Sequence, residues 1–289
     1  MARPCPDWTE PGESLTPSTS AGQGAGTIGV MDSTLVFDLE TIPDVVGIRR
    51  LYDLPAALSD ADVAQWAFSR QRVKSGTDFL PLYLHRVCAI SCVLREGQDR
   101  LAVWSLGEPD DDEPALLARF FQLIDSRTPR LVSWNGGAFD LPVLLQRGLI
   151  AGVAASRLLE TGANDRAFSF DHYLNRYKER HLDLMDFLAL YQPRANAPLD
   201  AMARLCGLPG KLGMDGGQVW AAWLAGRIDA IRAYCETDVM NTWLLYVRLL
   251  AMRGELESAA YEGEIALVRS KLSQMGQPHW VEYLAAWGT

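Results

Sequence analysis

The sequence predicts an α/β domain in which a mixed β-sheet carries helices on both faces. Short apolar runs that suit strands come first and alternate with helical patterns, whereas from residue 199 onward the pattern is that of consecutive helices. Strands and helices that interleave in this way pack as layers around one sheet. The chain has 289 residues, of which 48% are hydrophobic, so it is long enough for one large domain with a core and appendages.

The expected strands are short and apolar, and the first of them, residues 35–39, suits a strand buried on both faces. Further strands are expected at 87–94, 101–106 and 131–134, with a strand end near 181–185. Helices are expected from the acidic stretch 110–114 to about 125 and over 140–150, 199–206, 218–225 and 228 to about 252.

Three parts follow along the chain. Residues 1–30 are rich in Pro, Gly, Ser, Thr and Ala without hydrophobic periodicity, so we expect a disordered tail. The main domain is expected over 31–252, with a polar helical insertion at about 45–85. Residues 253–289 are expected to form a helical extension packed on the same domain.

Charge and cysteine usage exclude several classes of protein. A net charge of −9 argues against a broad clamp for nucleic acid, although a small cleft with bound metals stays compatible with it. The five cysteines include no C-x-x-C pair, which suits reduced thiols. With no membrane-length apolar run and no secretory signal, we expect a soluble cytoplasmic protein without a membrane partner.

Acidic residues recur in a fixed order along the predicted domain. Asp38 and Glu40 are two apart on the first strand, so both carboxylates point to one face. The alternative is that Leu39 faces the core while the acids face water. Asp140 follows a strand and opens a helix, where it suits both an N-cap and a third ligand at the edge of the sheet.

The last pair of the series lies on a helix. Tyr234 and Asp238 are four apart and share a face, whereas Glu236 falls off that face and is expected in solvent. A phenol beside a metal-bound carboxylate orients a water, although the ring alone could simply pack against the sheet. Four carboxylates in one pocket suit two divalent cations roughly 4 Å apart, and oxygen ligands favour Mg²⁺ or Mn²⁺.

The ordered motifs resemble those of DEDDy-type 3′–5′ exonucleases of the ribonuclease H-like superfamily, and most of all the stand-alone family related to the proofreading exonuclease domain of family B DNA polymerases. The likeness covers about 35–250. It implies a ribonuclease H-like sheet, with Asp38, Glu40, Asp140 and Asp238 as ligands of two Mg²⁺ or Mn²⁺ ions. It also implies that Tyr234 orients the attacking water.

The resemblance also implies candidate contacts to the 3′-terminal nucleotide, namely Leu39, Thr41, Asn135 and Phe139. Phe139 suits base stacking or core packing. Lys211 lies in the glycine-rich segment 207–217, which fails the P-loop pattern and suits a connector between helices, and it is a further candidate for a substrate phosphate.

The resemblance implies an enzyme that hydrolyses single-stranded DNA from the 3′ end and releases nucleoside 5′-monophosphates. An exoribonuclease of the same chemistry and a catalytically silent nucleic-acid-binding module are the alternatives. DNA is favoured over RNA as partner. Because no polymerase domain is recognised, proofreading would need a separate polymerase or repair partner. The sequence does not indicate the oligomeric state.

Overall fold

The computed structural model describes residues 33–97 and 100–287, so the tail expected at 1–30 lies outside the described residues. Five strands form one sheet in the order β3-β2-β1-β4-β5. Among the described strands, β2 runs antiparallel to both β1 and β3, whereas β1, β4 and β5 run parallel to one another. The sheet is therefore mixed, as predicted from the sequence. The strands are β1 (Thr34–Pro43), β2 (His85–Glu96), β3 (Arg100–Ser105), β4 (Arg130–Ser133) and β5 (His181–Asp183).

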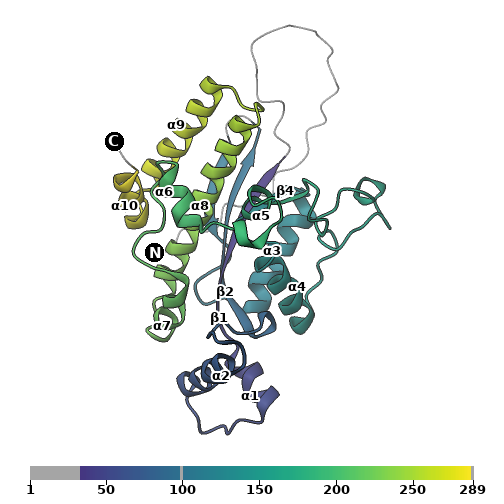
Figure 1. Ribbon diagram of the computed structural model, residues 1–289, viewed down its shortest axis with the longest axis vertical. Coiled ribbons are helices and arrows are strands. Elements are labelled where there is room, and N and C mark those ends of the chain that lie inside the picture. The colour runs from purple at the N-terminus through teal and green to yellow at the C-terminus, as the bar shows by residue number, and fades with distance from the viewer. Residues whose placement is uncertain (1–32, 98–99, 288–289) are drawn as a thin grey trace.

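Helices cover both faces of the sheet (Figure 1). One face packs against α3 (Glu113–Arg127) and α4 (Asp140–Ala151) through a core that contains Phe37 and Phe120. The other face packs against α8 (Ile228–Met252), α9 (Ser258–Met275) and α10 (Pro278–Ala286) around Trp243. Shorter helices α5 (Leu184–Leu188), α6 (Leu199–Leu205) and α7 (Val219–Leu224) connect β5 to α8.

Strand β1 lies in the middle of the sheet and alternates between the two cores. Leu35 and Phe37 belong to the core beneath α3 and α4, whereas Val36 belongs to the core beneath α8. Because side chains two apart on a strand share a face, Asp38 and Glu40 continue the Val36 side toward α8. The sheet therefore presents both carboxylates to the helix that carries Tyr234 and Asp238.

Strand β1 is followed by two helices, which are α1 (Val45–Tyr52) and α2 (Asp60–Ser75). They form the lower lobe in Figure 1. A small core centred on Ile48 and Val63 packs them together. A capping box between Ser59 and Asp62 begins α2. The chain then returns to the sheet, where the Asp44 amide donates to the Leu84 carbonyl at 2.8 Å. This return brings residues 78–85 beside the end of β1.

None of the helices in the described part of the chain is both long and apolar enough to cross a membrane. The C-terminal helices α9 and α10 pack on the α8 face, with Val268, Leu272, Trp280 and Tyr283 buried in its core.

Candidate active site

The predicted acidic residues converge where β1, α4 and α8 meet. The Asp38 side chain is partly buried, and the three remaining acids, Glu40, Asp140 and Asp238, are almost fully buried. Asp140 accepts a hydrogen bond of 3.1 Å from the Leu39 amide, which ties α4 to β1. Asp140 is the first residue of α4, and the N-cap position belongs to Phe139. The N-cap role considered for Asp140 is therefore wrong, and its carboxylate is directed to β1 instead.

Burial and the neighbouring carboxylates make ionisation of these acids less favourable. Burial, together with Asp238, raises the pKa of Asp38 to about 7. Burial also raises the pKa of Glu40 well above its ordinary value, with contributions from Asp38, Asp238 and Asp140. The pKa of Asp140 is raised well above its ordinary value by burial and by Asp38. Acids that are buried so close together need bound cations or protons.

The cluster has the donor atoms that a hard cation requires. Oδ1 of Asp238 is buried and has no hydrogen-bond partner among the described residues. The other oxygen of this carboxylate, Oδ2, is paired with Lys211. Ligand atoms of Asp38, Glu40 and Cys235 lie within 4.8 Å of one another. An unpartnered buried carboxylate oxygen beside two further acids fits a divalent metal.

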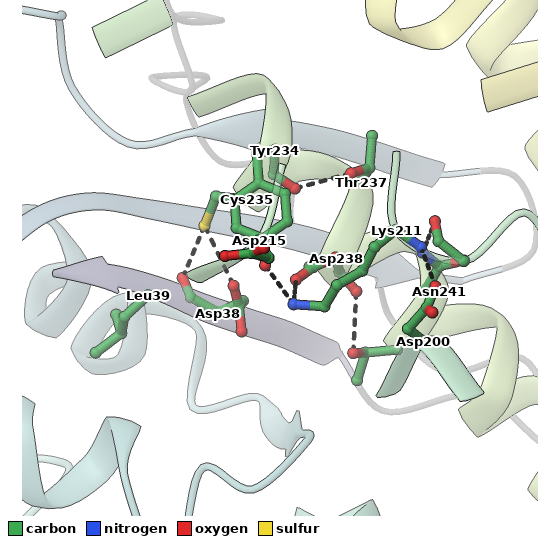
Figure 2. A network of polar contacts seen from close by, with 12 residues as sticks. Asp38, Leu39, Asp200, Lys211, Asp215, Tyr234, Cys235, Thr237, Asp238 and Asn241 are labelled. Atoms are coloured by element: carbon green, nitrogen blue, oxygen red, sulfur yellow. Dashed lines mark hydrogen bonds and ion pairs between the residues drawn. The ribbon is translucent and has the colours of Figure 1, made fainter. Parts of the chain in front are cut away.

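Cys235 is a neighbour of the acids that sequence reasoning missed. Its thiol lies 3.4 Å from the Asp38 carbonyl oxygen and 3.5 Å from Asp38 Oδ2, as Figure 2 shows. Burial and then Asp38 raise the pKa of this thiol well above its ordinary value, so it stays protonated and donates. The residue directly follows Tyr234, and that position was the only signal in the sequence.

Lys211 lies inside the acidic cluster (Figure 2). Its Nζ is 2.7 Å from Asp238 Oδ2 and also donates to the Tyr234 hydroxyl. Burial alone would lower the pKa of Lys211, but Asp238 raises it above the ordinary value. The ammonium is therefore charged and provides a positive charge among the carboxylates.

The loop that carries Lys211 is anchored at its backbone. The Lys211 amide donates to Asp200 Oδ1 at 2.7 Å, and Asn241 Nδ2 donates to the Gly210 carbonyl at 2.8 Å. Asn241 Oδ1 in turn accepts a 2.8 Å hydrogen bond from the Tyr283 hydroxyl of α10. A chain of contacts thus joins the C-terminal extension to the lysine of the site.

A second loop, residues 134–139, approaches the cluster from the end of β4. Asn135 has a left-handed backbone with φ of 68°, which asparagine tolerates better than most residues. Asp183 accepts from the amides of Asn135 and Gly137, both at 2.9 Å, and so fixes the loop. At Gly136 a Cβ would lie 2.3 Å from Ser133 Oγ, so this tight turn requires glycine.

A cavity of about 690 Å³ opens next to the acids. Glu40 lines it, and so do the predicted nucleotide contacts Leu39, Thr41, Asn135 and Phe139. Phe139 is partly buried and its ring packs 5.3 Å from His85. The predicted contacts are thus brought together, with Lys211 in the neighbouring cluster of charges.

The direction of the Thr41 hydrogen bond follows from its partner. His85 Nε2 lies 3.0 Å from the Leu80 carbonyl, an acceptor, so Nε2 carries the proton. Burial lowers the pKa of His85, which keeps the ring neutral and Nδ1 an acceptor. Thr41 therefore donates to Nδ1 at 2.9 Å, and its oxygen is left to accept from a ligand in the cavity.

Comparison with known proteins identifies the family of this chain. The model of a family described as predicted 3′–5′ exonucleases related to the exonuclease domain of PolB matches residues 77–287. The chain belongs to this family. The match includes Asp140, Lys211, Tyr234 and Asp238, whereas Asp38 and Glu40 precede it and are joined to the site by the sheet.

Among solved structures, this member of the PolB-related exonuclease family is similar to the family B DNA polymerase from the hyperthermophilic archaeon Pyrobaculum calidifontis. The sequence identity is 18% and the TM-score 0.45, over 75% of this chain and 24% of that one. The chain thus spans about a quarter of the polymerase's length. The search of curated proteins finds no matching sequence.

The expectation that Glu236 of this PolB-related protein lies in solvent is also wrong. Glu236 is not in solvent but is 8% exposed. It accepts from Ser105 at 2.8 Å and lies 2.9 Å from His279 Nε2. The extension helix α10 covers this side of α8, and its coverage could not be inferred from the period of α8 alone.

Proposed function

We propose that the protein is a metal-dependent 3′–5′ exonuclease that hydrolyses single-stranded DNA and releases nucleoside 5′-monophosphates. The observation that carries the proposal is the cluster of Asp38, Glu40, Asp140 and Asp238 beside a cavity large enough for a nucleotide. Membership of a family of predicted 3′–5′ exonucleases supports the same direction of attack.

The four carboxylates would hold two Mg²⁺ or Mn²⁺ ions. Asp238 offers its unpartnered Oδ1, and Asp38 and Glu40 offer oxygens that lie within 4.8 Å of one another. When bound, such ions supply Lewis acidity that activates water and neutralises charge on phosphate oxygens. The raised pKa values of these acids then cease to matter, because bound cations favour the charged carboxylates.

Tyr234 and Lys211 act at the same phosphate. Burial raises the pKa of Tyr234, and the nearby carboxylates raise it further, so the phenol keeps its proton at neutral pH. It therefore orients the attacking water by hydrogen bonding rather than by abstracting a proton. Lys211, which donates to this phenol, brings a positive charge toward the negative charge that develops on the phosphoryl oxygens.

The test is digestion of a 5′-labelled single strand, as DNA and as RNA of one sequence, with Mg²⁺ and with Mn²⁺ in parallel. We expect a ladder of products shortened from the 3′ end, nucleoside 5′-monophosphates, and faster digestion of DNA. Faster digestion of RNA would indicate the exoribonuclease. Binding of Mn²⁺ and of the strand without cleavage would indicate a silent binding module.

Asp38→Ala is the inactive control, and Asp110→Ala, at an exposed acid in the turn before α3, is its matched partner. We expect Asp38→Ala to fold and to lose cleavage, because the Asp38 carboxylate would be one of the groups that hold the metal ions. Near-wild-type turnover of Asp38→Ala at saturating metal would contradict the proposal.

A further inference from the structure

The cavity beside the acidic cluster has a wall that the helical insertion supplies. Phe79 and His85, from the segment that returns to the sheet after α2, line it together with Phe139 from the loop after β4. The three rings contact one another, with centroid separations of 4.8 Å between Phe79 and His85, 5.8 Å between Phe79 and Phe139, and 5.3 Å between His85 and Phe139. Segments distant in sequence thus form one continuous aromatic surface.

Phe79 leaves much of its ring uncovered, since the residue is 56% exposed although it lines a cavity. Exposure of a phenylalanine on a flexible loop would not by itself indicate a binding surface. This one is flanked by anchored residues, because Asp78 accepts from Arg72 Nε at 2.6 Å and the Leu80 carbonyl accepts from His85 at 3.0 Å. The ring is therefore held at the mouth of the cavity before any ligand arrives.

Gly216, Gly217 and Trp220 also line the cavity. A Cβ at Gly216 would have no heavy atom within 4 Å, so the space beside this glycine is open. A cavity lined by aromatic rings and by glycines leaves room for a flat group. Nucleobases are such groups, and they stack on aromatic side chains in a sequence-tolerant way.

The position of the cavity decides which base it would receive. Glu40 lines the cavity and also belongs to the acidic cluster. A base in the cavity would thus belong to a nucleotide whose phosphodiester lies at the carboxylates. In an enzyme that cuts from the 3′ end, that nucleotide is the terminal one.

We propose that residues 78–85 form the stacking surface for the unpaired 3′-terminal nucleobase, with Phe79 as its main contact. This inference rests on the proposed exonuclease function and assigns a specificity role to the helical insertion. Phe79 does not touch the acids; it selects an end whose last base has left the duplex and holds that base while the bond is cut.

The experiment compares two single-stranded DNA substrates that differ only at the last residue, which carries either a base or an abasic tetrahydrofuran. The rate of the first cleavage gives kcat/KM for each. We expect wild type to favour the base-bearing end by roughly 5- to 150-fold, the equivalent of one stacked base. Phe79→Ala should lose most of this preference and leave cleavage of the abasic end unchanged.

Phe79→Tyr keeps an aromatic face and should retain the preference, whereas Phe79→Leu, apolar but without that face, should lose much of it. Phe170→Ala is the matched control, because Phe170 is 82% exposed and does not line the cavity. It should behave like wild type.

The possible failures are separable. Wild type that cleaves both ends equally would overturn the stacking role and leave the exonuclease intact. An equal loss on both substrates in Phe79→Ala would also overturn it, because Phe79 would then support the fold rather than the base. Failure of wild type to cut either strand with Mg²⁺ or Mn²⁺ would overturn the proposed function itself.

Discussion

The Nζ of Lys211 lies 2.7 Å from Oδ2 of Asp238, so an ammonium group lies among the carboxylates proposed to bind metal. A charged group on a flexible four-carbon stem stabilises the acids without closing the site permanently. The pair links the glycine-rich connector to α8, the longest described helix of the domain. Removal of the Lys211 charge is therefore expected to affect metal binding and turnover in opposite directions.

Lys211→Met should tighten Mn²⁺ binding while it slows cleavage. Removing the ammonium removes a cation that competes for Asp238, but it also removes positive charge from the phosphate. We expect affinity to rise several-fold and turnover to fall about 10- to 1000-fold. Calorimetric Mn²⁺ titration and single-turnover cleavage measure the two effects. Weaker Mn²⁺ binding in the variant would show that Lys211 mainly orders the site.

Tyr234→Phe should reduce turnover about 10- to 1000-fold, the range for one positioned polar group, and preserve Mn²⁺ affinity. Only the hydroxyl that contacts Lys211 is lost, and the ring still packs between β1, β2 and α7. Single-turnover rates and calorimetry on the same preparation provide the comparison. A loss of metal affinity instead would mean that Tyr234 supports the carboxylates and that another group orients the water.

The metal-free protein should become less stable as pH rises from about 4 to about 7. The pKa of Asp38 is raised from 3.8 to about 7, so the folded state holds the proton that the unfolded state releases. Buried His181, with its pKa lowered to about 4, acts in the opposite sense over the same range. The measured quantity is therefore the difference in melting temperature between wild type and Asp38→Asn.

In EDTA, the melting temperature of Asp38→Asn relative to that of wild type should rise as pH increases from about 4 to about 7. Mn²⁺ should stabilise wild type more than the variant at pH 7.5, because the cation favours the ionised carboxylate. A difference in melting temperature that is flat with pH would contradict the assignment of a raised pKa to Asp38.

Tyr283→Phe should destabilise the protein by about 1–3 kcal/mol, the cost of leaving a buried acceptor unpaired. The hydroxyl donates to Asn241 Oδ1 at 2.8 Å, and both residues are 0% exposed. Because Asn241 holds the Gly210 carbonyl, turnover should fall as well. Urea unfolding and cleavage assays test both effects. Tyr261→Phe is the control, since the Tyr261 hydroxyl accepts an exposed 3.5 Å contact from Arg248.

Single-stranded or frayed 3′ ends should be degraded faster than blunt duplex. A chain with net charge −9 has little basic surface to grip two backbones, and the cavity beside Glu40 suits one unstacked end. The assay uses one sequence in both forms at fixed salt. Equal or faster degradation of blunt duplex would show a basic face that the net charge conceals.

Periodicity was sufficient to predict several parts of the site. A strand alternates faces, so the two-residue spacing of Asp38 and Glu40 placed both acids on one side. A helix repeats about every four residues, so Tyr234 and Asp238 were expected on one face, and both contact Lys211. The boundaries of α8 at residues 228 and 252 also agree with the expected helix.

Loops have no hydrophobic period, so the positions of their side chains follow only from tertiary contacts. Nothing in the spacing of the glycine-rich segment placed Lys211 against Asp238, because its position depends on anchors from α6 and α8. Phe79 and His85 reach the cavity only because the α1–α2 pair returns the chain to the end of β1. The strands, the order of the acids and their shared faces could be predicted from the sequence, since these follow from local backbone geometry. Which charges and rings surround them depended on contacts between segments far apart in the chain.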